Sequence, residues 1–167
     1  MVQLRISKYP PHLRDEDGNY TVDDWTSVSD VGQEFQGRPL TASGYLSVED
    51  AFVQVARDLL TWAGLRELTI QGIEKHGDIS ALPKGVAWKE NTNPDNLAEG
   101  DVLQLAAIED VVRLNLREVI WCKMSGVKNF YLHFGYDYYM YAGFDGDLPT
   151  DSSCPPLYME PFPSPYR

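Results

Sequence analysis

The sequence contains few of the residues that build disulfide frameworks and metal sites. It has two cysteines, Cys122 and Cys154, and three histidines in 167 residues. Two cysteines are too few for a disulfide framework, so we expect a reducing compartment and a cytoplasmic protein. The first residues show no basic segment followed by an apolar one, so no signal peptide is expected. No apolar run approaches the roughly 20 residues that a membrane-spanning helix needs, so no membrane partner is expected.

Positive charge is also scarce. The chain carries 14 lysines and arginines against 25 aspartates and glutamates, which gives a net charge of −11 and a pI near 4.6. Proteins that bind nucleic acids or anionic membrane surfaces carry basic patches, so both kinds of partner are disfavoured. An acidic surface instead accelerates association with a basic protein. Because many proteins carry excess acid only for solubility, both interpretations of the charge stay open.

Catalytic and cofactor motifs are missing as well. The sequence contains no HExxH, CxxC, GxSxG, P-loop or GxGxxG pattern. We therefore expect no metal, no cofactor and no enzymatic activity. Asp15, Asp17 and Asn19 occupy the first three ligand positions of a calcium-binding loop. However, Tyr20 and Thr26 stand where that loop needs its glycine and its bidentate glutamate.

One histidine leaves an enzymatic alternative open. His133 alternates with apolar residues, and Asp137 follows it closely. A histidine beside a carboxylate can act as a general base, which makes a small enzyme or a ligand-binding module with an aromatic pocket around His133 the alternative function. A hydrogen-bonded structural histidine explains the same pattern, because no candidate nucleophile lies in a motif.

Aromatic residues are concentrated in residues 128–144, which read KNFYLHFGYDYYMYAGF. Apolar residues alternate with Tyr131 and His133 in the first half, which is the period of a β-strand. A short turn at residues 135–137 separates this half from a second aromatic run. The pattern predicts a hairpin with one face on a core and the other face at least partly sheltered.

The remaining patterns predict a single α+β domain. A length of 167 residues suits one domain, and a hydrophobic fraction of 43% is normal for a globular protein. Period-two and apolar runs at residues 2–6 and 68–73 predict two further strands. Helical spacing predicts one helix from an N-cap at Ser47 to Gly64 and another across residues 101–124. We expect a mainly antiparallel sheet, two main helices and the aromatic C-terminal hairpin.

Two segments are rich in residues that interrupt regular structure. Residues 76–99 contain prolines, asparagines and glycine and predict a long connection, which is often a binding surface. Residues 149–167 are rich in proline and serine. We therefore assign the domain to residues 1–148 and expect residues 149–167 to be extended or partly disordered.

Acidic residues beside aromatic ones are the candidate contacts for a basic protein partner. Tyrosine is an efficient interface residue, and carboxylates complement basic groups. Tyrosines that cover a core while their hydroxyls contact water give the same pattern. The candidate partner-binding residues are Asp15, Glu16, Asp17, Asp23, Asp24, Tyr136, Asp137, Asp145 and Asp147.

Two stretches of the chain carry a family resemblance. DDWTSVSDVGQEFQGRPLT, followed by YLSVEDAF, resembles the amino-terminal part of small bacterial immunity proteins, and HFGYDYYMYAG resembles a segment near their end. These proteins are encoded beside the toxin domains of contact-dependent growth inhibition and other polymorphic toxin systems. The resemblance covers residues 23–143, and the proline-rich segment after it departs from the family pattern.

The resemblance implies a cytosolic α+β toxin inhibitor that binds one cognate toxin domain. Many toxins of these systems are nucleases and therefore basic, which fits the acidic charge of this chain. No catalytic residue is carried over from the family. We expect carboxylates and aromatic rings to occupy the cleft where the toxin would bind phosphates, as in the barnase–barstar pair.

Overall fold

The structure, a computed structural model, describes residues 1–150 and 152–166. Its centre is a seven-stranded antiparallel sheet with the order β5-β4-β6-β7-β8-β1-β9. The strands are β1 (Val2–Ser7), β4 (Glu67–Lys75), β5 (Val102–Gln104), β6 (Ile120–Ser125), β7 (Tyr131–Gly135), β8 (Tyr139–Phe144) and β9 (Tyr158–Pro161). A separate two-stranded hairpin consists of β2 (Glu34–Phe35) and β3 (Arg38–Pro39).

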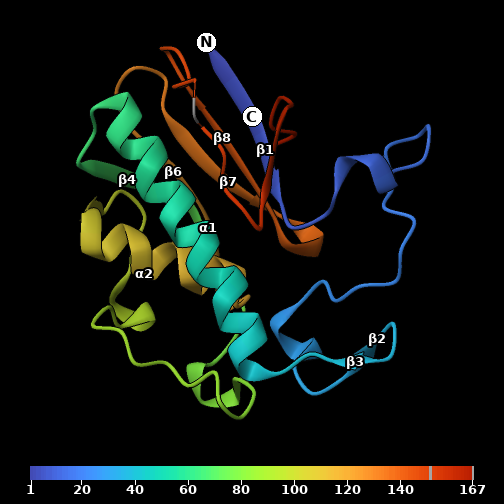
Figure 1. Ribbon diagram of the computed structural model, residues 1–167. Coiled ribbons are helices and arrows are strands. Elements are labelled where there is room, and N and C mark those ends of the chain that lie inside the picture. The colour runs from blue at the N-terminus through green and yellow to red at the C-terminus, as the bar shows by residue number, and fades with distance from the viewer. Residues whose placement is uncertain (151, 167) are drawn as a thin grey trace.

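Two helices, α1 (Ala42–Ala63) and α2 (Leu105–Leu116), pack against each other and contribute to one core with the sheet (Figure 1). This arrangement confirms the predicted α+β class. Short 3-10 helices punctuate the loops: η1 (Pro11–Leu13), η2 (Val28–Asp30), η3 (Ile79–Ala81), η4 (Pro94–Asn96) and η5 (Tyr136–Tyr138). Within the described residues, no helix is long and apolar enough to cross a membrane.

Helix α1 ends where we expected but begins earlier. Gly64 adopts a left-handed conformation with φ of 69° and donates its N–H to the last carbonyls of the helix, as a terminating glycine does. The N-cap is Thr41, whose hydroxyl accepts from the N–H of Gly44 at 3.0 Å. The expected cap, Ser47, lies inside the helix. The extra turn brings Tyr45 into the core, where it is fully buried.

The helix predicted across residues 101–124 is only partly confirmed. Residues 105–116 are helical, whereas residues 102–104 and 120–125 are strands. Helix α2 stops at Leu116, and the backbone of Glu118 turns left-handed with φ of 58°. Residues 120–125 form β6, which lies between β4 and β7 in the sheet. In β6 the buried positions alternate with half-buried ones, a strand pattern that the four apolar residues 119–122 conceal.

The predicted aromatic hairpin is confirmed, and its two faces differ. Successive residues of β7 and β8 point alternately toward the helices and toward a second layer of side chains on the other face of the sheet. The helix side holds the pairs Leu132–Ala142 and Phe134–Met140, and the other side holds Tyr131–Gly143 and His133–Tyr141. A Cβ at Gly143 would overlap the ring of Tyr131, so this position requires glycine.

The proline-rich C-terminal segment covers the part of the second face of the sheet around β7 and β8. Strand β9 pairs antiparallel with β1, so the chain termini lie close together (Figure 1). The rings of Phe162 and Tyr166 lie 6.2 and 5.9 Å from the ring of Tyr141. The boundary that we placed after residue 148 therefore does not separate this segment from the domain, because part of it is a strand of the main sheet.

Candidate functional site

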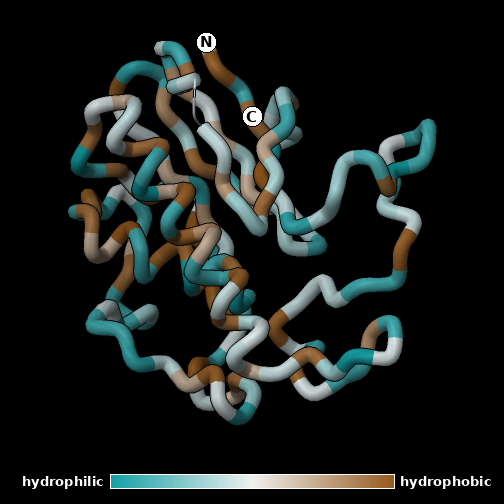
Figure 2. Tube along the Cα trace, in the orientation of Figure 1, coloured by the Kyte–Doolittle hydropathy of each residue, from teal (hydrophilic) through white to brown (hydrophobic). Residues whose placement is uncertain are grey.

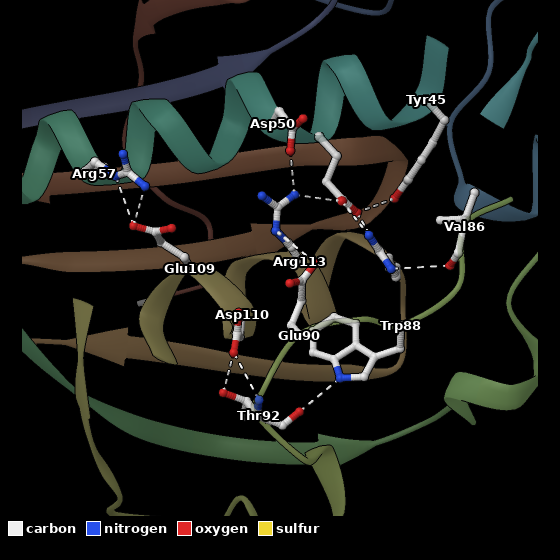
Figure 3. A network of polar contacts seen from close by, with 12 residues as sticks. Tyr45, Asp50, Arg57, Val86, Trp88, Glu90, Thr92, Glu109, Asp110 and Arg113 are labelled. Carbon is white, nitrogen blue, oxygen red and sulfur yellow. Dashed lines mark hydrogen bonds and ion pairs between the residues drawn. The ribbon is translucent and has the colours of Figure 1, made fainter. Parts of the chain in front are cut away.

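The most deeply buried charges join the two helices (Figure 3). Glu49 is fully buried and accepts two hydrogen bonds of 2.7 Å from Arg117, one of 2.9 Å from Arg113 and one of 3.2 Å from Tyr45. Burial would lower the pKa of Arg117, but Glu49 outweighs this effect and the pKa is raised. These groups satisfy one another inside the fold, so their role is to hold α1 against α2.

The same network fixes the long connection that we expected to be a binding surface. Arg117 also donates to the carbonyl of Val86 at 3.3 Å, and Thr92 Oγ1 donates to Asp110 at 2.6 Å (Figure 3). The indole N–H of Trp88 donates to the carbonyl of Thr92 at 3.0 Å. This part of the connection is therefore tied to α2.

The turn of the aromatic hairpin consists of residues 136–138, and its first two side chains are exposed. We call this turn the Tyr136 ridge. Tyr136 is 86% exposed, whereas Tyr138 is buried and packs edge-on against Trp25 and Phe52 at 4.8 and 5.2 Å. Asp137 and Tyr138 have φ of 59° and 66°, a left-handed conformation that is costly for residues other than glycine. Burial of Tyr138 holds this conformation and presents Tyr136 to solvent.

One side of the Tyr136 ridge borders a cavity of about 370 Å³, which we call the acidic hollow. Its lining includes Tyr9, Tyr20, Asp24, Asp137 and Tyr139. Tyr9 donates its hydroxyl to the carbonyl of Asp137 at 2.7 Å, and burial raises the pKa of this tyrosine. The N-terminal part of the chain is thereby attached to the hairpin turn, 128 positions later in sequence.

The acidic loop, residues 15–24, contributes several residues to the lining of this hollow. The loop projects from the body of the protein and is hydrophilic at its tip (Figures 1 and 2). The carboxylate of Asp15 accepts hydrogen bonds from the backbone N–H groups of Asn19 and Asp17. These bonds lower the pKa of Asp15, and the bond from Asn19 has the largest effect. Asp24 lies 2.6 Å from Lys8 Nζ. Both carboxylates are therefore engaged within the chain, while Glu16, Asp17 and Asp23 are exposed.

Lys8 is a buried cation that pairs with Asp24 of the acidic loop. Its side chain is 6% exposed, and its Nζ lies over the rings of Tyr9 and Trp25 at 4.3 and 4.2 Å. Burial lowers the pKa of Lys8 to about 8 even though Asp24 acts in the opposite direction. Asp24 therefore serves to neutralise a buried lysine and is a poor contact for a partner.

The other side of the Tyr136 ridge borders a cavity of about 430 Å³, which we call the aromatic hollow. Its lining includes the aromatic residues Trp121, Tyr136 and Tyr166 and the buried Phe134, and the polar residues are Glu74, His76, Asn115 and Glu118. We missed this site in the sequence. The sequence signal for this site was the alternation in residues 120–125, which places Trp121 on the opposite face of the sheet from its neighbours Ile120 and Cys122. We missed this signal because we predicted a helix there.

The structure separates two of the predicted contacts from the others. Tyr136 and Asp137 precede β8, whereas Asp145 and Asp147 follow it. A strand of six residues spans about 20 Å, so the two groups lie at opposite ends of the sheet. Asp145 also accepts from Asn129 at 2.7 Å. The acidic loop and the Tyr136 ridge form one surface, and Asp145 and Asp147 belong to another.

His133 lies in the aromatic layer on the second face of the sheet. Its ring is 6% exposed and stacks on Tyr131 at 4.5 Å, and its Nδ1 lies 2.8 Å from Ser164 Oγ. It does not line the acidic hollow or the aromatic hollow, and Asp137 is exposed on the Tyr136 ridge. In residues 1–150 and 152–166, no three histidine, cysteine or acidic side chains gather as a metal site.

Comparison of the chain with protein-family models, curated proteins and solved structures found no match to any of them.

Proposed function

We propose that the chain is a cytoplasmic immunity protein that binds a basic toxin domain, a nuclease, and blocks its active site without catalysing a reaction. The observation that carries this proposal is the Tyr136 ridge. An 86% exposed tyrosine stands on an anchored turn between two cavities, and carboxylates border both. Exposed aromatic rings with acidic neighbours are typical contacts for basic proteins.

The proposed mechanism is occlusion. A nuclease cleft is lined by cations that hold phosphates, and the carboxylates of Asp17, Asp23 and Asp137 offer those cations a substitute. Tyr136 enters the cleft as the anchor, because its ring loses little side-chain freedom on binding. The net charge of −11 steers the encounter with a basic partner.

The test is direct binding to the toxin domain encoded beside the gene for this chain. We expect a tight complex by calorimetry and loss of the nuclease activity at equimolar inhibitor. Tyr136→Ala should weaken binding by about 2 kcal/mol, or roughly 30-fold, because a central aromatic anchor is removed. The far-ultraviolet circular dichroism should not change, since the side chain is exposed.

Val127→Ala is the control. Val127 is also an exposed apolar side chain, at 69%, but it lies between β6 and β7, at the end of the sheet away from the Tyr136 ridge. Its replacement should leave the affinity within about twofold of the original. A wild-type chain that neither binds nor inhibits the toxin would contradict the proposed function.

A further inference from the structure

The aromatic hollow combines aromatic rings with carboxylates. Trp121 is held there by a 2.8 Å hydrogen bond from its indole N–H to the carbonyl of Phe134 and by edge-on contact with Tyr166 at 5.9 Å. Glu74 comes from β4, in register with Trp121, and Glu118 comes from the turn after α2. The rings are thus positioned before any ligand arrives, which lowers the entropic cost of binding.

The two carboxylates retain capacity to accept hydrogen bonds. The Glu74 side chain is 63% exposed and lies 3.2 Å from His76 Nε2. Glu118 is exposed and accepts from the hydroxyl of Ser27 at 3.0 Å. Each ionised carboxylate offers about four acceptor positions, so a cationic donor can bind without breaking these contacts.

Elsewhere in the chain the same combination surrounds a cation. In three places among the described residues, lysine or arginine side chains lie over aromatic rings while a carboxylate pairs with them. These groups are Arg5 and Arg14 with Phe162, Tyr139 and Glu160, Lys8 with Trp25 and Asp24, and Arg117 with Trp88 and Glu49.

The aromatic hollow differs from these three places in one respect. Among the described residues that line it, none is a lysine or an arginine. The hollow therefore brings together the same kinds of groups as the internal cation sites, aromatic rings and carboxylates, without a guanidinium or ammonium group of the chain among its described lining residues. A cavity of about 430 Å³ is large enough for a side chain of a partner.

We infer that the aromatic hollow receives an arginine side chain of the protein partner, an inference that rests on the proposed function. A guanidinium group is planar, stacks on an indole ring and donates to two carboxylates at once. A lysine ammonium is more strongly hydrated and cannot stack in this way. A second copy of this chain is a poor occupant, because each copy carries a charge of −11.

The first experiment uses the isolated chain and a small probe. N-acetyl-arginine amide is titrated while the indole N–H signal of Trp121 is followed by NMR, with the signal assigned by its loss in Trp121→Phe. We expect a saturable shift with a millimolar dissociation constant. N-acetyl-citrulline amide, which has nearly the same shape without the charge, should give no saturable shift.

Variants locate the site. Glu74→Gln with Glu118→Gln should weaken arginine amide binding at least fivefold. Asp145→Asn with Asp147→Asn removes the same charge at the far end of β8 and should change it less than twofold. Equal binding of the citrulline amide, or equal weakening by both double variants, would overturn the inference.

The second experiment uses the toxin complex and separates this inference from the proposed function. Glu74→Gln with Glu118→Gln should lower toxin affinity at least tenfold, and Asp145→Asn with Asp147→Asn should not. A toxin that binds the wild type and this glutamine variant equally well would overturn the inference and leave the proposed function in place. A toxin that does not bind at all would overturn the proposed function, and the arginine amide titration would then still decide whether the hollow is a cation site.

Discussion

Glu49 and Glu118 are both carboxylates near Arg117, but Glu49 is buried and Glu118 is exposed. Glu49 faces Arg117 across the two helices, is 0% exposed and contacts two guanidinium groups and a tyrosine hydroxyl. Glu118 follows Arg117 directly in sequence, but its left-handed backbone points it outward to the aromatic hollow. The first carboxylate is saturated by the fold, and the second still has room for a partner.

The comparison shows that charge alone does not identify a binding residue. What matters is how many internal partners the group already has. Asp15 and Asp24, which we expected to contact a partner, resemble Glu49 in this respect because they bind backbone amides and Lys8. Glu74 and Glu118, which we overlooked, are exposed and have one partner each, His76 and Ser27, so they can accept further hydrogen bonds.

The largest effect should come from Glu49→Gln. This change leaves Arg117 and Arg113 partly unpaired in a buried setting, which costs about 3 to 5 kcal/mol of unfolding free energy. Glu118→Gln is the control and should change the unfolding free energy by less than about 0.5 kcal/mol. Urea denaturation measures both. A loss below about 1 kcal/mol for Glu49→Gln would show that the buried network is not what holds the helices together.

The buried thiol of Cys122 gives a second measure of global unfolding. Burial raises its pKa from an ordinary value of 9.0 to about 11, so the folded chain favours the protonated thiol. This contribution to stability is present below pH 9.0 and is lost as the pH rises toward 11. At pH 8 the thiolate fraction is lower than in a free cysteine by about 100-fold.

In a Cys154→Ser background we therefore expect Cys122 to react with Ellman's reagent at pH 8 only through global unfolding. Adding Glu49→Gln should accelerate the reaction by about 100-fold, because a loss of about 3 kcal/mol raises the unfolded population by that factor. The control is the same background with Glu118→Gln, which should react at the original rate. Fast labelling of Cys122 without Glu49→Gln would mean that its site opens locally.

The smallest effect concerns carboxylates far from the Tyr136 ridge. The association rate with the toxin should fall as ionic strength rises, since the Debye length is about 8 Å at 0.15 M salt. Asp145→Asn with Asp147→Asn should slow association by about twofold at low salt and flatten the salt dependence, with little change in dissociation. Surface-based kinetics at several salt concentrations measure this. An association rate independent of salt would assign the acidic surface to solubility.

The local patterns of the sequence were sufficient for several elements. Strand β1, strand β4, the β7–β8 hairpin and the glycine end of α1 follow from residues that are neighbours in the chain, because alternation and capping are local properties. Tyr136 and Asp137 were identified for the same reason. They occupy the turn between two runs that predict strands, and turns usually lie at the surface, whereas the burial of Tyr138 in the same turn depends on distant contacts with Trp25 and Phe52.

Tertiary structure alone decided the rest. Residues 120–125 form β6 because β4 and β7 provide hydrogen bonds on both sides, and β9 is ordered because β1 offers it an edge. The aromatic hollow joins Glu74, Glu118, Phe134 and Tyr166 from four separate segments. Which carboxylates are saturated and which are free depends on such distant contacts, and the energy of those contacts is set by burial that no local pattern contains.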